Sequence, residues 1–227
     1  MLLSACSMAR VPWRNEPVGR EVNLSFTIEN NLLYLTTVRV DGLSGRFFLG
    51  TAHARSVLDP RFGAGMARHI VQLSEKEARP ITPAIVPLRG LGDGIIGSDV
   101  WGDRATVTLD YRSGLITLNK DRLSNDEMTV YGFAAEPRIV VDVAGRPVDA
   151  IVDTTSPDTL VLPRNGAPAS RTTARVSIAG SDLGDVSIRY DDVSAPRVGN
   201  RVLSKFLVSI DYGRKTVSLW RDPRIPR

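Results

Sequence analysis

The chain has 227 residues, of which 42% are hydrophobic and 24% are charged, a composition typical of a globular protein. The 29 basic and 25 acidic residues are scattered along the chain, without a basic stripe interleaved with aromatic residues, which argues against a nucleic-acid partner. One cysteine and two histidines give neither an intrachain disulfide nor a Cys/His zinc cluster. We therefore expect no metal and no cofactor.

The first 20 residues are expected to form an anchor and a tether ahead of the folded part. Residues 3–6, Leu-Ser-Ala-Cys, resemble the lipobox at which bacterial lipoproteins are cleaved and lipidated on the cysteine. Residues 7–20 contain two prolines and a glycine and have no hydrophobic periodicity. The resemblance implies a lipid on Cys6 and a location on the periplasmic side of a bacterial cell envelope, with membrane contact only through that anchor.

From residue 21 onward the sequence predicts short β-strands separated by turns. Apolar residues occupy every second position of 22–28, and such alternation is typical of a half-buried strand. The three prolines between residues 80 and 87 fit only loops or edge strands, because proline lacks a backbone donor. A short helix is expected within 61–70. These patterns predict an all-β fold with few short helices.

The chain also contains an internal repeat. Residues 42–60 line up with residues 145–163 without a gap, at an offset of 103 residues. This alignment places Gly50 opposite Asp153 (153 − 50 = 103).

A second pair of similar segments follows each copy, around Gly97 and around Gly199 (199 − 97 = 102). The repeat predicts two similar lobes, 21–120 and 121–227, with the polar stretch 119–127 between them.

Asp153 stands at the end of an apolar run and begins the sequence Asp-Thr-Thr-Ser, which leads into the strand-like residues 159–161, Thr-Leu-Val. Together with the repeat, this stretch resembles the active-site loop of aspartic proteases, whose two lobes each carry an Asp-Thr-Gly loop. The resemblance covers about residues 22–220. It implies a two-lobed pepsin- or retropepsin-like fold (acid protease barrel) and the chemistry of a hydrolase, an aspartic endopeptidase.

In that family two carboxylates share one proton, so that one acts as the base for the attacking water and the other as the acid. The resemblance assigns these positions to Gly50 and Asp153, so the first loop carries no carboxylate. Two nearby acids, Asp59 and Asp99, are the candidates within this chain for a non-standard second acid. Asp59, however, aligns with residue 162, at the far end of the following strand.

The third residue of each loop is glycine in the family, and here Ala52 and Thr155 stand in its place. The threonine before it is kept in both loops, as Thr51 and Thr154. The resemblance implies that these hydroxyls reach the backbone of the opposite loop and lock the lobes together, since a buried hydroxyl needs a partner. Gly97 and Gly199 keep the apolar-Gly elements that support the two loops.

These features favour a catalytically impaired pseudoprotease that binds an extended peptide or protein segment in the cleft between its lobes. An alternative is an active but atypical aspartic endopeptidase in which Asp153 works with a different acid. A third reading is a structural envelope lipoprotein with a vestigial cleft. Residues 60–94, where the family has a flap hairpin, show no hairpin with a glycine-rich tip. The sequence names no ligand.

Overall fold

The computed structural model describes residues 21–63, 65–102, 106–119 and 127–221. The predicted anchor and tether, with Cys6, and most of the predicted boundary between the lobes lie outside these residues. The described part is all-β, as the sequence predicts, with two four-residue helices, α1 (Pro60–Gly63) and α2 (Asn200–Leu203). The helix expected within 61–70 is therefore a single turn, and a strand begins at His69. No helix among the described residues is long and apolar enough to cross a bilayer.

The largest element is a sheet of 11 strands in the order β13-β21-β20-β11-β12-β1-β2-β5-β10-β6-β9. Its strands are β13 (Thr129–Gly132), β21 (Thr216–Trp220), β20 (Leu207–Asp211), β11 (Thr106–Asp110), β12 (Leu115–Asn119), β1 (Val22–Glu29), β2 (Leu32–Leu35), β5 (Phe47–Leu49), β10 (Gly94–Ile96), β6 (Val57–Leu58) and β9 (Ala84–Ile85). In β1 the alternation seen in the sequence holds for its first three apolar residues, which are buried, whereas Ile28 is exposed.

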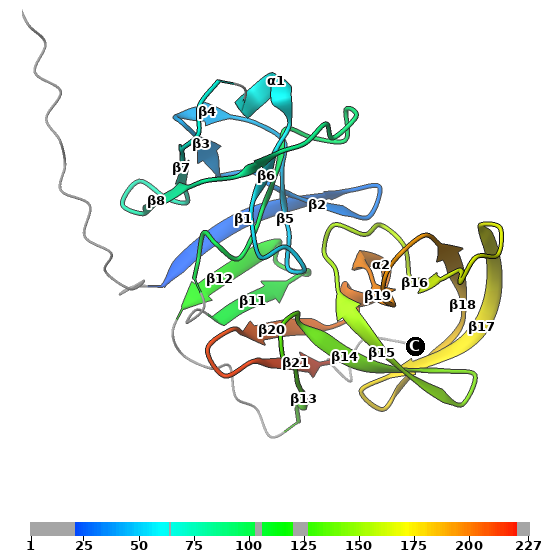
Figure 1. Ribbon diagram of the computed structural model, residues 1–227. Helices are drawn as coiled ribbons and strands as arrows, with labels where there is room; N and C mark the ends of the chain where they lie inside the picture. The colour runs from blue at the N-terminus through cyan, green and yellow to red at the C-terminus, as the bar shows by residue number, and fades with distance from the viewer. Residues whose placement is uncertain (1–20, 64, 103–105, 120–126, 222–227) are drawn as a thin grey trace, which may run out of the picture.

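Both halves of the chain contribute to this sheet. Strands β1, β12 and β11 come from the first half, and β20, β21 and β13 come from the second, with β11 and β20 paired in the middle (Figure 1). In the β11–β20 pair Thr108 lies opposite Ser209, its equivalent in the repeat (209 − 108 = 101). Their hydroxyls are hydrogen-bonded at 3.2 Å. A local two-fold axis that relates the two halves therefore passes between these two residues.

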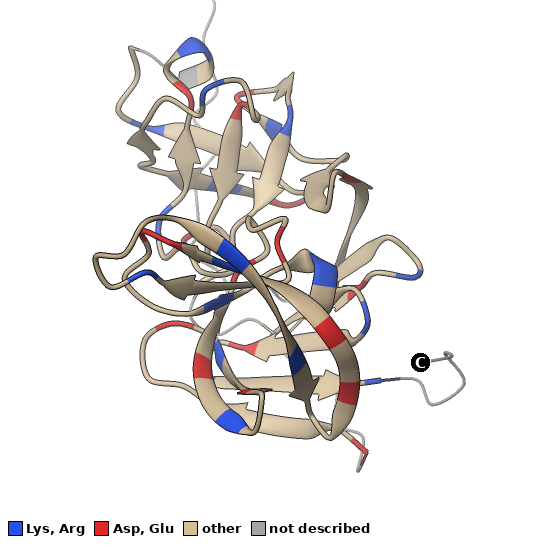
Figure 2. Cartoon of the chain, turned by 90° about the vertical axis from the view of Figure 1, so that its right-hand side faces the viewer, with Lys and Arg blue, Asp and Glu red and all other residues tan. Residues whose placement is uncertain are grey.

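The second half also forms a closed six-stranded barrel, in the order β14-β15-β19-β16-β18-β17. Its strands are β14 (Arg138–Val143), β15 (Arg146–Val152), β19 (Arg197–Val198), β16 (Leu160–Pro163), β18 (Ser181–Asp191) and β17 (Ser170–Ile178). The barrel lies beside the shared sheet, on the right in Figure 1. Acidic and basic residues are interspersed over its strands (Figure 2), and several are paired, as Arg175 is with Asp182.

A smaller sheet of the first half has the order β4-β3-β7-β8, with β4 (Leu43–Ser44), β3 (Arg39–Val40), β7 (His69–Gln72) and β8 (Ala78–Ile81). Strands β7 and β8 form a hairpin within the stretch 60–94, where the sequence shows no hairpin with a glycine-rich tip. Its tip is not glycine-rich: Leu73 and Ser74 donate backbone hydrogen bonds to Glu77. Pro80 lies on β8, an edge strand, as its missing donor requires.

One apolar core runs through both halves. Its largest fully buried side chains include Phe47, Leu49 and Ile96 from the first half and Ile139 from the second. Burial of apolar area is the main favourable contribution to folding. The same packing fixes the strand ends from which the two repeated loops emerge.

Candidate functional site

Two loops with the same backbone structure follow β5 and β15. Each of these strands is parallel to a short strand, β10 or β19, that is followed directly by a glycine. Equivalent backbone bonds hold the two loops: Gly50 N–H to Ile96 O (2.8 Å) and Asp153 N–H to Val198 O (3.0 Å), then His53 N–H to Gly50 O and Ser156 N–H to Asp153 O (both 3.1 Å). Positions 50 and 153 are thus equivalent in structure as well as in sequence.

Gly97 and Gly199 lie directly beneath these loops, where a side chain has no room. A Cβ at Gly97 would lie 2.7 Å from the carbonyl oxygen of His53. A Cβ at Gly199 would lie 2.4 Å from the carbonyl oxygen of Asp158 and 2.6 Å from that of Ser156. Both contacts are with backbone atoms, which cannot move aside cheaply. Glycine is therefore required at both positions by close approach.

Thr51 and Thr154 join the two loops. The Thr51 hydroxyl donates to the carbonyl oxygen of Val152 (2.6 Å), and the Thr154 hydroxyl donates to that of Leu49 (2.5 Å). Each hydroxyl oxygen also accepts from the backbone N–H of the other threonine, at 3.2 Å. Both threonines are almost fully buried. This reciprocal set of four hydrogen bonds ties the ends of β5 and β15 together.

Two tyrosines at equivalent positions of the repeat are connected to the threonine pair by hydrogen bonds, one directly and one through Asn200. The Tyr212 hydroxyl donates to the carbonyl oxygen of Thr51 (3.1 Å). The Tyr111 hydroxyl donates to the Oδ1 of Asn200 (2.8 Å), whose Nδ2 donates to the carbonyl oxygen of Thr154 (2.7 Å). Burial raises the pKa of both tyrosines well above the ordinary value, so both stay neutral donors.

Asp153 is buried, and its carboxylate is occupied by donors from its own half of the chain. Its Oδ1 accepts from the backbone N–H and the hydroxyl of Thr155, at 2.9 and 2.6 Å. Its Oδ2 accepts from the Nη1 of Arg197 at 2.7 Å, which makes an ion pair. Among the described residues, no carboxyl group is hydrogen-bonded to Asp153. The carboxylate of Asp153 is therefore paired with a guanidinium and not with a second acid.

Thr155 stands where the resemblance places glycine. Its Cβ does not displace Asp153, because the side chain turns its hydroxyl toward the carboxylate. At the equivalent position of the first loop, Ala52 is half-buried and offers no such donor.

At the first loop, neighbouring side chains take up the space beside Gly50. A Cβ on Gly50 would lie 2.5 Å from the Cγ2 of Ile95 and 3.0 Å from the Nδ1 of His53. Ile95 and Arg197 are equivalent in the repeat (197 − 95 = 102). The half that contains Gly50 thus has an apolar side chain at this strand position, and the half that contains Asp153 has a cationic one.

His53 is a neutral imidazole at neutral pH. Burial lowers its pKa below the ordinary 6.5, and the Arg197 guanidinium lowers it further, against the opposing effect of the Asp153 and Glu136 carboxylates. The Nδ1 of His53 is buried and has no hydrogen-bond partner among the described residues. The imidazole therefore carries an unused polar atom beside Gly50.

Asp59 and Asp99, the two candidates for a second acid, have their carboxylates hydrogen-bonded to other parts of the first half. Asp99 accepts from the backbone N–H and the hydroxyl of Ser56, at 3.0 and 2.6 Å. Asp59 accepts from the side chain and backbone of Arg61 and from the N–H of Leu88, and these bonds lower its pKa to about 2. Both carboxylates stabilise the loops of the first half.

Sequence reasoning did not single out Arg197 and His53. The signal for Arg197 is present in the repeat, because a charged residue stands there at the strand position that Ile95 fills in the other copy. For His53 the equivalent residue is the small Ser156. The described residues contain no group of three or more potential metal ligands.

Neither a comparison of the sequence with models of known protein families nor one with curated proteins finds a match.

Proposed function

We propose that this chain has the two-lobed fold of the aspartic proteases without their catalysis, and that it binds an extended peptide or protein segment between its lobes. The observation that carries the proposal is the Asp153–Arg197 ion pair opposite Gly50. A carboxylate paired with a guanidinium has no second carboxyl group with which to share a proton. The division into acid and base on which the protease reaction depends is then lost.

The support for a retained scaffold comes from what surrounds this pair. The threonine bonds, the two close-packed glycines and the tyrosine supports are present in both halves, although position 50 has lost its carboxylate. Holding two buried loops in one geometry costs conformational entropy, which the chain recovers only through such contacts. A rigid, catalytically silent site of this kind is suited to binding.

The polar groups at the site suggest how it holds a ligand. The Arg197 side chain is 27% exposed, and its Nη1 is bonded to Asp153. A guanidinium carries five N–H donors in a fixed plane, so the remaining donors suit main-chain carbonyl oxygens. An extended segment presents such oxygens at every second residue along one side.

Two measurements on the purified protein test the proposal. The first follows the digestion of fluorescein-labelled casein from pH 3 to pH 7, where we expect no turnover. Cleavage that pepstatin inhibits and that Asp153→Asn abolishes would establish the atypical endopeptidase instead.

The second measurement uses pepstatin itself as an extended, peptide-like probe in an amide NMR titration. We expect saturable shifts at Thr51, Thr155 and Arg197, weakened at least fivefold by Arg197→Leu and unchanged by Arg201→Leu, a matched substitution at an exposed arginine of α2. The absence of saturable shifts at these residues would count against a peptide site.

The envelope location stays a separate proposal that rests on the lipobox-like residues alone. Lipidation of Cys6 predicts that the protein partitions into the detergent phase of a Triton X-114 extract of a bacterial host, and that Cys6→Ser moves it to the aqueous phase. A wild-type protein that stays wholly aqueous would contradict it.

A further inference from the structure

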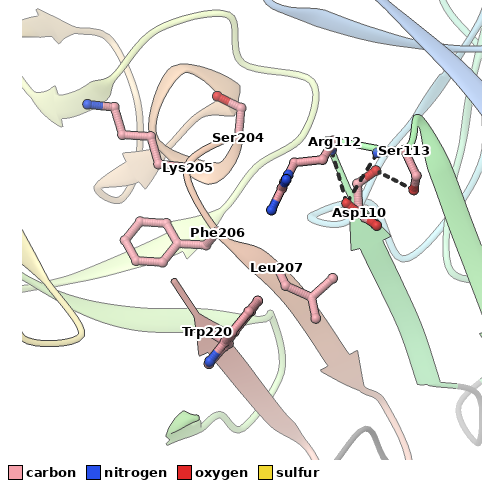
Figure 3. A pocket seen from close by; sticks show the side chains of 8 residues that line it. All are labelled: Asp110, Arg112, Ser113, Ser204, Lys205, Phe206, Leu207 and Trp220. Atoms are coloured by element: carbon pink, nitrogen blue, oxygen red, sulfur yellow. Dashed lines mark hydrogen bonds between the residues drawn. The ribbon is translucent and has the colours of Figure 1, made fainter. Parts of the chain in front are cut away.

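A pocket of about 360 Å³ lies at one end of strands β11, β20 and β21 of the shared sheet, and it involves none of the residues of the two loops (Figure 3). Three cross-strand neighbours form one row at its base: Asp110 on β11 pairs with Leu207 on β20, which pairs with Trp220 on β21. The remaining lining residues come from the turn after β11 and from the segment between α2 and β20: Arg112, Ser113, Ser204, Lys205 and Phe206. The volume is at the lower end of the range for small-molecule sites.

The side chains at the base of this pocket differ from those at the equivalent place in the other half of the repeat. The equivalent row in the other half consists of Asp211, Thr106 and Asn119, which are also cross-strand neighbours. There Thr106 stands in place of Leu207, and Asn119 stands in place of Trp220 (207 − 106 = 101; 220 − 119 = 101). The two halves therefore differ at this position of the sheet, where one has a threonine and an asparagine and the other has a leucine and a tryptophan.

The walls of the pocket are held by hydrogen bonds within the protein. The Oδ1 of Asp110 accepts from the backbone N–H groups of Arg112 and Ser113, at 3.0 and 3.3 Å. On the other side, the backbone N–H groups of Lys205 and Phe206 donate to the last turn of α2, at 2.9 and 3.0 Å. The pocket is thus formed before any ligand arrives, which lowers the entropy cost of binding.

The chemistry of the lining defines the ligand. The Trp220 indole donates from Nε1 to Glu127 at 3.0 Å, which leaves its apolar faces for contact, and the Phe206 ring is buried beside it. Arg112 and Lys205 are both exposed lining residues, and in Figure 3 the Arg112 guanidinium points into the pocket, whereas the Lys205 ammonium points away from Trp220. The charge of Asp110 is directed at backbone donors of its own turn. An apolar base with a guanidinium group beside it favours a ligand with a flat apolar body and one negative charge.

We propose that this pocket binds a small aromatic or alicyclic carboxylate, with its ring on Trp220 and Phe206 and its carboxylate at the Arg112 guanidinium. The site is independent of the peptide site proposed above, since the two share no residue.

The test uses two probes with the same indole body and opposite charge, indole-3-propionate and tryptamine, in amide and indole NMR titrations of the full chain. Indole-3-propionate is expected to give saturable shifts at the Trp220 indole N–H and at the amides of 205–207. Tryptamine is expected to bind at least tenfold more weakly. Equal binding of both probes, or no saturable shift at these residues, would overturn the proposal.

Two variants and a matched control locate the interaction. Arg112→Glu is expected to weaken indole-3-propionate at least tenfold, whereas Arg201→Glu, the same change at an exposed arginine of α2, leaves it unaltered. Trp220→Asn copies the other half of the repeat and is expected to abolish the shifts at 206 and 207. If Arg112→Glu, with a native-like spectrum, binds as the wild type does, the assignment of the carboxylate to Arg112 is wrong.

Discussion

Ile95 and Arg197 occupy the same position in the two copies of the repeat, and each lies against the first residue of its own loop. The Cγ2 of Ile95 lies 2.5 Å from where a Cβ of residue 50 would stand, and the Nη1 of Arg197 is bonded to Asp153. The two halves therefore differ as matched pairs, Gly50 with Ile95 and Asp153 with Arg197. In each half the side chain on the parallel strand matches the first residue of the loop: an apolar side chain lies beside the glycine, and a cationic side chain is bonded to the aspartate.

Replacing Arg197 by leucine is expected to destabilise the protein by about 1–3 kcal/mol. This is less than the ~3–5 kcal/mol for breaking a fully buried pair, because the arginine side chain is partly exposed. Asp153 would keep only the two donors of Thr155. Urea denaturation measures the change, and Asp153→Asn added to Arg197→Leu should recover part of it by removing the unpaired charge. A double variant that is no more stable than Arg197→Leu would contradict this account.

Replacing Thr154 by valine should cost more than Asp153→Asn. The substitution removes the donor to Leu49 and the acceptor for the N–H of Thr51, and each buried group left unsatisfied costs about 1–3 kcal/mol. In Asp153→Asn, by contrast, the new amide oxygen would still accept from Thr155. The control is Thr36→Val, at an exposed hydroxyl that donates to Ser25, where a change within about 0.5 kcal/mol is expected. The free energies of unfolding of the three variants are compared. A larger loss for Asp153→Asn than for Thr154→Val would refute the prediction.

Position 50 should not tolerate a side chain while Ile95 is present. Gly50→Ala is expected to cost about 1–3 kcal/mol through overpacking. In the Ile95→Ala background the cost should fall by at least half, which a double-mutant cycle measures. Gly132→Ala is the control, since a Cβ there meets nothing within 4 Å. For the same steric reason, Gly50→Asp alone is expected to confer no pepstatin-sensitive cleavage. Additive effects of Gly50→Ala and Ile95→Ala would show that the two positions are not coupled.

Asp59 should contribute to the acid sensitivity of the fold. Hydrogen bonds, first from the Arg61 side chain, lower its pKa from 3.8 to about 2 in the folded state. A carboxyl group with a depressed pKa contributes stability that is present above pH 3.8 and is lost as the pH falls toward 2. Asp59→Asn should therefore be less stable than the wild type at pH 7, and the difference should shrink between pH 4 and pH 2. Thermal unfolding at a series of pH values tests this, and a difference independent of pH would refute it.

The sequence by itself determined the all-β class and the equivalence of the two halves. Alternating apolar residues specify half-buried strands locally, and the repeat places Gly50 opposite Asp153, Gly97 opposite Gly199 and Thr51 opposite Thr154. It also limits Pro80 to a loop or an edge strand, because a missing N–H excludes proline from the middle of a sheet wherever that sheet lies. Each of these inferences depends on local geometry or on comparison of one copy with the other.

Only the tertiary structure decided what the side chains of the site do. Arg197 and Asp153 are 44 residues apart along the chain, and a strand position does not reveal whether a guanidinium points to solvent or to a carboxylate. The place of His53 beside Gly50 and the row from Asp110 through Leu207 to Trp220 likewise depend on the pairing of distant strands. Such contacts arise from register and packing, which a local sequence pattern does not encode.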